Sequence, residues 1–363
     1  MTHLNELYLI LNKYLKWNKS HLKCFALIML VIILKQTCNL SSASKALPIK
    51  CLPQSFYRRM QRFFAGQYFD YRQISQLIFN MFSFDQVQLT LDRTNWKWGK
   101  RNINILMLAI VYRGIAIPIL WTLLNKRGNS DTKERIALIQ RFIAIFGKDR
   151  IVNVFADREF IGEQWFTWLI EQDINFCIRV KKNFIVTNHL GKNHKISDLF
   201  RHLKVGQIEC RKRRILVGRV KLYISALQLE NGELLLVVSP QFNANAIQDY
   251  ALRWVIETLF SCLKGRGFNL ENTRLTDPRR VKKLIAVLAI SFCWCYLTGE
   301  WQHDQKKAIK IKKHGRLSMS LFRYGLDYVQ MAIQRLIGFG KKEEFKEILA
   351  ILRRQNPDRI RVL

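Results

Sequence analysis

The chain has few acidic residues for its length. It carries 60 lysines and arginines against 27 aspartates and glutamates in 363 residues, so its formal net charge is +33. A folded protein with this excess of positive charge repels itself unless it binds a polyanion, and nucleic acid is the usual partner. Apolar residues make up 49% of the chain, which is too many for a disordered basic tail. The 9 tryptophans and 23 phenylalanines favour a large folded protein over a ribosomal or histone-like one.

The cysteine and histidine patterns of metal sites are also missing. The eight cysteines form no CxxC pair, and Cys293 and Cys295 lie in the apolar run AVLAISFCWCYL. The seven histidines are dispersed along the chain. A zinc knuckle or a histidine-rich site is therefore not predicted. We expect free, mostly buried thiols in a reducing cytoplasm.

No hydrophobic run is long enough to predict a membrane span. The run CFALIMLVIIL, from Cys24 to Leu34, has 11 residues between Lys23 and Lys35, whereas a spanning helix needs about 20. A signal peptide can have a hydrophobic region of this length, but 23 residues precede this one. The sequence favours a buried helix, and no membrane partner is expected.

Residues 1–85 have a helical and basic pattern and form the predicted DNA-binding domain. Two short helices joined by a tight turn are expected, the first capped by Ser41 or Ser42 and the second opening at Ser55. The second helix carries three cations, Arg58, Arg59 and Arg62. This arrangement resembles a helix-turn-helix, and a small helical bundle with a cationic surface is the alternative. Both remain open, although the charge favours contact with DNA.

From residue 86 the hydrophobic period becomes that of strands. QVQLTLD alternates and ends at Asp92, and IVNVFAD is an apolar strand that ends at Asp157. The remaining elements are expected as strands at 103–112, 115–124 and 176–180 and helices at 132–146 and 163–171. Three strands, a helix, a strand, a helix and a strand is the order of the RNase H-like fold. The predicted class is therefore α/β, with a catalytic domain over residues 86–300.

A second pattern interrupts this domain at about 181–233. Residues 179–221 contain 13 lysines and arginines and only two acids, and alternating stretches such as RILVGRVKLYISALQL predict strands. We interpret this part as a β-rich, cationic insertion, after which residues 234–239 return to the parent sheet. Residues 301–363 are expected to form a basic helical C-terminal region.

The segment DYALRWVIETLFSCLKGRG brings four polar residues together if it is one helix. Tyr250, Arg253, Glu257 and Lys264 then lie within about 60° of arc on one face. An acid, two cations and a phenol suit phosphate and a metal ion, while the opposite face is apolar and can anchor the helix to a sheet. A solvated face with an Arg253–Glu257 pair is the alternative.

Three carboxylates are predicted to converge in this fold. Asp92 and Asp157 end two strands of the sheet, and Glu257 lies on the late helix. Carboxylates in such a cluster hold two Mg²⁺ ions around an in-line phosphoryl displacement. A single aspartate at a strand end is usually a turn former, and Asp149 and Glu159 are assigned to turns or helix starts.

Three motifs carry a resemblance to a known family. They are LDRTNWKWGKRNIN around Asp92, VFADREFIG around Asp157, and YALRWVIETLFSCLKGRG around Glu257. The last contains Y-x2-R-x3-E-x6-K, the spacing that marks the IS4 family of DDE transposases, from bacterial insertion sequences. The chain resembles this family over about residues 38–300.

The resemblance implies a cut-and-paste transposase that excises an element at its terminal inverted repeats and joins it to target DNA. It implies a homodimer on paired double-stranded ends, in the bacterial cytoplasm at the nucleoid. Asp92, Asp157 and Glu257 would be catalytic and would bind Mg²⁺, with Mn²⁺ as an alternative. Tyr250, Arg253 and Lys264 would hold DNA phosphates.

Two other functions and one residue role stay open. The chain could be an RNase H-like nuclease without strand transfer, or a catalytically silent DNA-binding protein derived from a transposase. Some family members use a tryptophan of the insertion to stack on a flipped base, but no tryptophan occurs here between Trp168 and Trp254. Phe184, Tyr223 or Trp96 are the candidates for that role.

Overall fold

The computed structural model of the chain describes residues 2–47, 51–187 and 191–353. It is a mixed α/β structure with one large sheet and many helices. Two compact units make up the chain. One consists of residues 85–95 and 104–258, and the other of residues 1–84, 96–103 and 259–363. The division into domains at residues 85 and 300 stays a prediction.

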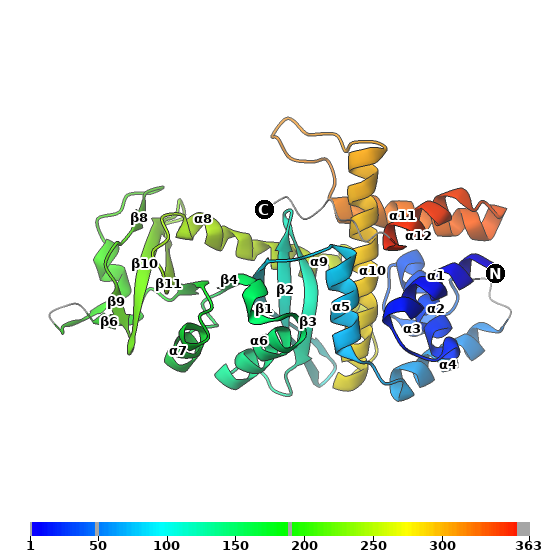
Figure 1. Cartoon of the computed structure of the whole chain (residues 1–363), viewed down its shortest axis with the longest axis horizontal. Helices are drawn as coiled ribbons and strands as arrows, with labels where there is room; N and C mark the ends of the chain where they lie inside the picture. Colours follow the sequence, from blue (N-terminus) through cyan, green and yellow to red (C-terminus); the bar gives the residue numbers. More distant parts are fainter. Residues whose placement is uncertain (1, 48–50, 188–190, 354–363) are drawn as a thin grey trace. The chain divides into compact units, whose positions relative to one another are not determined.

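Most of the sheet belongs to the unit of residues 85–95 and 104–258, and only the end of β1 and the start of β2 fall within residues 96–103 of the other unit. Figure 1 labels the strands along the chain. Within the described residues the sheet has eleven strands. Ten of them follow the order β3-β2-β1-β4-β5-β11-β10-β9-β6-β7, and the eleventh, β8, pairs with β10. The first five strands are β1 (Val87–Trp98), β2 (Arg101–Tyr112), β3 (Ile115–Leu123), β4 (Ile151–Ala156) and β5 (Phe176–Val180). β2 and β3 are antiparallel, while β1–β4 and β4–β5 are parallel. All five predicted strands of this half are therefore confirmed.

The burial of these strands follows their composition. Residues 103–110 of β2 are buried without a break, as expected for an apolar run covered on both faces. Pro118 lies in β3, the first strand in the order of the sheet, where a missing N–H is tolerated. The register of β2 and β3 shifts between Leu108 and Ala109, opposite this proline.

Short helices pack on this sheet. α6 (Thr132–Phe146) contacts β3, and α7 (Glu163–Glu171) contacts β10. A capping box starts α6, because the Asp131 side chain accepts from the Glu134 backbone and Glu134 returns the bond. α8 (Ala246–Ala251) contacts β5, β10 and β11. Helices α6 and α7 have the bounds predicted from the sequence.

The second half of the sheet is built from shorter strands. They are β6 (Ile185–Thr187), β7 (Asn193–Lys195), β8 (Ile208–Cys210), β9 (Ile215–Val217), β10 (Val220–Gln228) and β11 (Leu234–Ser239). β11 pairs antiparallel with both β5 and β10. Strand β11 thus joins the sheet at residues 234–239, as predicted. The segment from β6 to β10 is rich in strands, and its description as an insertion stays a prediction.

The other unit is helical. Its helices are α1 (Thr2–Tyr14), α2 (Lys19–Lys35), α3 (Leu40–Ala43), α4 (Pro53–Gly66), α5 (Tyr71–Met81), α10 (Pro278–Gln305), α11 (Leu321–Phe339) and α12 (Glu343–Arg353). α10 contacts α2, α4, α5, α11 and α12, and Figure 1 shows α5 alongside it. The run 24–34 lies inside α2 and most of it is buried, so the predicted buried helix is confirmed.

Two details of the N-terminal prediction are wrong. The cap of α3 is Asn39, whose side chain accepts from the backbone N–H groups of Ser41 and Ser42. α4 begins at Pro53 rather than Ser55, because proline suits the first helical turn, where its missing N–H costs nothing. Arg58, Arg59 and Arg62 are exposed on α4, and their contact with DNA stays a prediction.

α10 contains an 18-residue window that makes it long and apolar enough to cross a membrane. However, 89% of that window is buried inside the structure, as in the core helix of a folded unit. Among the described residues, the only other segment of comparable length and hydropathy is the bent pair Asn5–Tyr14 and Lys19–Lys35, which turns by 112°. The six cysteines at 24, 38, 177, 262, 293 and 295 are buried and all eight are free, as expected.

Candidate active site

Two aspartates lie at the point where the pairing of the parallel strands β1 and β4 ends. The last register partners of the two strands are Leu91 and Ala156, and Asp92 and Asp157 come directly after them. Because β1 and β4 are neighbouring parallel strands, these two aspartates lie at the same edge of the sheet. The structure thus brings together the first two predicted catalytic residues.

The prediction that β1 ends at Asp92 is wrong. β1 continues to Trp98, because after Arg93 the buried residues Thr94 and Trp96 alternate again with exposed ones. The following turn at Gly99 has φ of 56° and leads into β2. Asp92 therefore lies within a strand, at the point where its pairing with β4 stops.

Asp92 is largely buried and both of its oxygens are engaged. Oδ1 accepts from the backbone N–H of Arg93 at 2.7 Å, and Oδ2 accepts from Nη1 of Arg253 at 3.0 Å. Burial raises the pKa of Asp92 to about 6, and the nearby charges of Glu159 and Asp157 add to the rise. The two hydrogen-bond donors oppose it. A carboxylate with a raised pKa beside other carboxylates is typical of a functional site.

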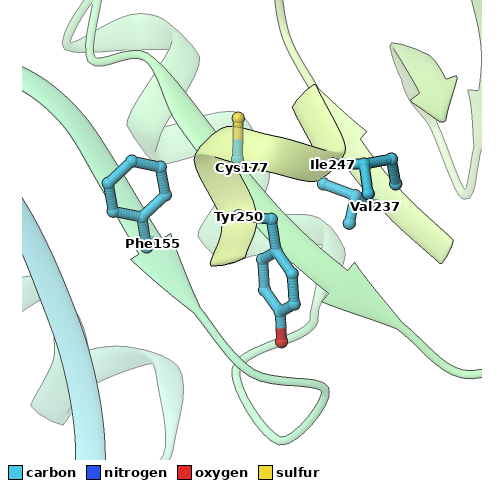
Figure 2. Packing of buried hydrophobic residues seen from close by; sticks show 5 residues of the cluster. All are labelled: Phe155, Cys177, Val237, Ile247 and Tyr250. Carbon is cyan, nitrogen blue, oxygen red and sulfur yellow. The ribbon is translucent and has the colours of Figure 1, made fainter. Parts of the chain in front are cut away.

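Tyr250 connects the hydrophobic core to Asp157. Its ring packs with Phe155, Cys177, Val237 and Ile247, and Figure 2 shows its hydroxyl pointing away from this cluster. The hydroxyl donates to Oδ1 of Asp157 at 3.3 Å. Burial raises the pKa of Tyr250 above its usual range, so this group stays a phenol and a hydrogen-bond donor at neutral pH.

Arg253 is the centre of the site. Its side chain is 3% exposed, and its Nη2 donates to Oε1 of Glu257 at 2.7 Å while Nη1 holds Asp92. The guanidinium also lies 4.8 Å from the centroid of the Trp254 ring. One buried fork therefore connects a carboxylate of the sheet with the half-exposed carboxylate of the late helix.

The segment that carries these residues is not one regular helix. α8 ends at Ala251, a 3-10 turn η3 covers Leu252–Trp254, and α9 runs over Val255–Leu263. The prediction of a single polar face is wrong, because Tyr250 and Arg253 are buried while Glu257 is exposed. The apolar anchors of α9 are as expected, with Ile256, Leu259 and Leu263 buried.

Lys264 follows α9 and belongs to the helical unit. Its Nζ lies 2.7 Å from Oε1 of Glu271 and 6.0 Å from the centroid of the Trp96 ring. The three other predicted DNA-binding or catalytic residues of this segment belong to the sheet unit. The role of Lys264 stays a prediction.

The candidates for base stacking differ in their surroundings. Trp96 is buried, with 7% of its surface exposed. Phe184 and Tyr223 are half-buried, and Tyr223 packs against Phe242 and the guanidinium of Arg214. A half-buried ring can still present a face to a ligand, so the role stays open between these residues.

The donors of the site suit a hard divalent cation by their chemistry, since Asp92, Asp157 and Glu257 offer only carboxylate oxygens. The described residues contain no group of three or more His, Cys, Asp or Glu side chains placed to hold a metal ion. Arg253 instead occupies one oxygen of Asp92 and one of Glu257. The carboxylate oxygens are thus of the kind that divalent ions prefer, but Arg253 pairs with two of them in this structure.

Sequence reasoning missed one charged pair of the site. Glu159, assigned to a turn, does lie in a turn after β4, but its carboxylate pairs with Arg93. The sequence did contain a signal for this pair, because residues of opposite charge, Arg93 and Glu159, lie within two positions of Asp92 and Asp157. Asp149 lies in the short 3-10 helix Lys148–Arg150, in keeping with its predicted turn.

Comparisons with known proteins add a family to this geometry. Residues 83–294 match the sequence profile of a family described as transposase DDE domain. No curated protein matches the chain. A cryo-EM structure of piggyBac transposase in a synaptic complex with hairpin DNA aligns over 98% of this chain and 84% of that one, at 12% identity and a TM-score of 0.46. That degree of likeness carries no argument about this chain.

Proposed function

Because the chain belongs to the transposase DDE domain family, and so to enzymes of nucleotidyl transfer, we propose that it is a DNA transposase of the IS4 type. In this proposal it excises a bacterial insertion sequence at its terminal inverted repeats and joins the ends to target DNA. The observation that carries the proposal is that Asp92 and Asp157 directly follow the last paired residues of two adjacent parallel strands, and that Arg253 connects Asp92 to Glu257. The order and pairing of β1 to β5 support an RNase H-like catalytic core.

Asp92, Asp157 and Glu257 are the residues that would hold the divalent ions used by this family, Mg²⁺ in our proposal and Mn²⁺ as an alternative. Bound there, the ions supply Lewis acid chemistry at the scissile phosphate. Tyr250 donates a hydrogen bond to Asp157 and so fixes the direction of that carboxylate. Asp92 is fixed in the same way by the N–H of Arg93.

Arg253 has two tasks in this proposal. In the free protein its guanidinium neutralises Asp92 and Glu257, which otherwise repel each other. When a scissile phosphate enters, the same planar fork can bind two phosphate oxygens, which a lysine cannot match. Lys264 supplies a further point charge to the DNA.

The proposed reaction consists of phosphoryl transfers that balance at each step. Water attacks the phosphorus at the end of the element, and the 3′ oxygen leaves with a proton. The free 3′-OH then attacks the opposite strand and, after the hairpin is opened, the target strand. In each step one P–O bond forms and one breaks, so positioning and charge stabilisation are what the protein contributes.

Double-stranded DNA is the proposed partner, and a homodimer on paired ends is the proposed assembly, in the cytoplasm at the nucleoid. The formal charge of +33 supports a polyanionic partner. The cations Arg58, Arg59 and Arg62 of α4 are a candidate contact surface.

The test is a cleavage and joining assay on labelled duplex DNA taken from the sequences that flank the reading frame. We expect Mg²⁺-dependent nicking at the element boundary and transfer of the pre-cleaved 3′ ends into a target plasmid, both abolished by EDTA. Nicking without transfer would instead identify a nuclease. Binding without nicking would identify a catalytically silent DNA-binding protein.

A further inference from the structure

Arg93 and Glu159 form a two-pronged ion pair beside the two aspartates. Nε of Arg93 donates to Oε1 of Glu159 at 3.1 Å, and Nη2 donates to Oε2 at 3.1 Å. The side chains are only 15% and 21% exposed. Arg93 follows Asp92 directly, and Glu159 comes two residues after Asp157. The pair therefore ties the residue after one aspartate to the loop after the other.

The remaining donors of Arg93 are also used by the protein. Nη1 donates to Oδ1 of Asn104 at 3.1 Å and, more weakly, to Oδ1 of Asn95 at 3.5 Å. Nη2 donates to Oδ1 of Asn129 at 3.2 Å. With the two bonds to Glu159, the five N–H groups of this guanidinium have five acceptors. The guanidinium of Arg93 therefore bonds within the protein and has no N–H group left for a phosphate.

The partners of Arg93 are themselves fixed. Asn104 is 1% exposed, and its Nδ2 donates to the carbonyl oxygens of Lys126 and Gly128 at 3.1 and 2.9 Å. On the other side, Nη2 of Arg135 donates to the main-chain oxygen of Glu159 at 2.9 Å. Arg135 is 4% exposed and belongs to α6. Both ends of the ion pair are therefore anchored in the rigid framework of the sheet unit.

Arg93 also acts on Asp92 itself, because its backbone N–H donates to Oδ1 at 2.7 Å. A guanidinium locked in place fixes this backbone and hence the direction of the carboxylate. Both oxygens of Glu159 accept from Arg93, which leaves Glu159 a partner of the arginine rather than a fourth acid for the metal.

We propose that Arg93 and Glu159 are positioning residues that set the spacing and direction of Asp92 and Asp157 for metal binding. The inference rests on the proposed function, since it assumes that these aspartates hold the ions. Groups that orient metal ligands typically change metal affinity by about 10–100-fold when they are mutated. A single ammonium cannot replace the fork at such a site.

The experiment uses the full chain and measures Mn²⁺ binding by the loss of the free-ion electron spin resonance signal, beside the melting temperature and binding to a labelled duplex end. We expect Glu159→Gln and Arg93→Lys each to weaken Mn²⁺ binding about 10-fold or more. The double variant should bind Mn²⁺ about as tightly as the single variant with the lower affinity, because each substitution alone already removes the ion pair. End binding should change less than about two-fold.

Arg158→Gln is the matched control, because Arg158 lies between Asp157 and Glu159 but is 54% exposed and pairs only loosely with Glu233, at 3.4 Å. It should leave Mn²⁺ affinity within about two-fold. If Glu159→Gln lost a bound ion while Arg93→Lys bound Mn²⁺ normally, Glu159 would be a metal ligand and the clamp would be refuted. Lower melting temperatures with unchanged Mn²⁺ affinity would show a purely structural pair and refute it as well. Absence of Mn²⁺ binding in the unmutated chain would instead contradict the proposed function.

Discussion

At the scale of single residues, Arg253 departs most from what its sequence context suggests. The spacing to Glu257 allows an ordinary surface pair, and the pair exists at 2.7 Å. However, the arginine side chain is 3% exposed and also holds Asp92, so this is not a solvated helix face. Its Nε is buried and has no hydrogen-bond partner within the described residues. Arg253 is therefore a buried cation that joins two carboxylates, Asp92 and Glu257.

Arg253→Lys should therefore damage cleavage far more than folding. A lysine keeps the charge but reaches one carboxylate at a time, so it cannot join Asp92 and Glu257 as the fork does. We expect single-turnover cleavage of a labelled end to fall by at least about 100-fold. The free energy of unfolding should fall by only about 1–2 kcal/mol, as when one charged hydrogen bond is removed.

The control is Arg323→Lys in α11, where Arg323 pairs with Asp327 at the same i,i+4 spacing but with 43% and 44% exposure. It should cost less than about 0.5 kcal/mol and leave cleavage unchanged. If Arg253→Lys and Arg323→Lys had the same small effects on unfolding and on cleavage, Arg253 would be an ordinary surface ion pair.

Asp92 should make stability depend on pH in the metal-free protein. Its pKa is about 6 in the folded chain against 3.8 for a free side chain. Between these values the folded chain retains a proton that the unfolded chain has released, so the free energy of unfolding falls as pH rises from about 4 to about 6. Asp92→Asn should remove this fall, which is of the order of 2–3 kcal/mol. Urea unfolding of both proteins in EDTA at about pH 4.5 and about pH 7 measures it, and parallel pH profiles would contradict the assignment.

At the scale of elements, the sequence predicted the sheet unit closely wherever the hydrophobic pattern was strong. Helices 132–146 and 163–171 and strands 176–180 and 234–239 have the predicted bounds. These segments have clear caps or uniform apolar runs between turn residues, so local preference and packing agree.

The errors lie where tertiary contacts overrode local pattern. The polar residues after Asp92 suggest a loop, yet Thr94 and Trp96 are buried and keep β1 going to Trp98. Similarly, Tyr250 is held in a core cluster and Arg253 reaches Asp92, which turns both inward and accompanies the 3-10 break at 252–254. The pairing of Arg93 with Glu159 was hidden because its partners are 66 residues apart.

The crossing of α10 and α11 depends on two glycines. A Cβ on Gly325 would lie 1.8 Å from the carbonyl oxygen of Cys295 and 2.4 Å from the backbone nitrogen of Gly299. Backbone atoms cannot yield by that much without moving a helix. Gly325→Ala should therefore destabilise the protein by about 3 kcal/mol or more, seen as a lower melting temperature.

Gly338 in the same helix provides the comparison, because a Cβ there meets nothing within 4 Å. Gly338→Ala should be neutral or stabilise the protein by up to about 1 kcal/mol. If both variants melted alike, the close approach of the two helices would be wrong.

At the scale of the whole molecule, positive charge is the dominant property. The excess of +33 predicts attraction to DNA that weakens steeply with salt, because bound phosphates release their counterions. We expect cations that are bound within the protein to contribute less than exposed ones. Arg211 bonds to Glu209 and to the carbonyl oxygen of Leu199, while Lys212, Arg213 and Arg214 are exposed.

Replacing Lys212, Arg213 and Arg214 together by glutamine should flatten the plot of log affinity against log salt concentration. The slope should change by about 0.9 for each phosphate of duplex DNA that the variant no longer neutralises. Arg211→Gln should leave that slope unchanged and lower the melting temperature, because Arg211 bonds within the protein. An unchanged slope in the triple variant would show that this strip faces away from DNA.

The central claim is that Asp92, Asp157 and Glu257 form one metal-dependent catalytic site. Single-turnover cleavage of a labelled transposon end in Mg²⁺, with end binding measured on the same samples, tests it most directly. Asp92→Asn, Asp157→Asn and Glu257→Gln should each abolish cleavage and leave end binding largely intact, because DNA affinity comes mainly from lysine and arginine. Near wild-type cleavage by any one of the three variants would contradict the role of that carboxylate.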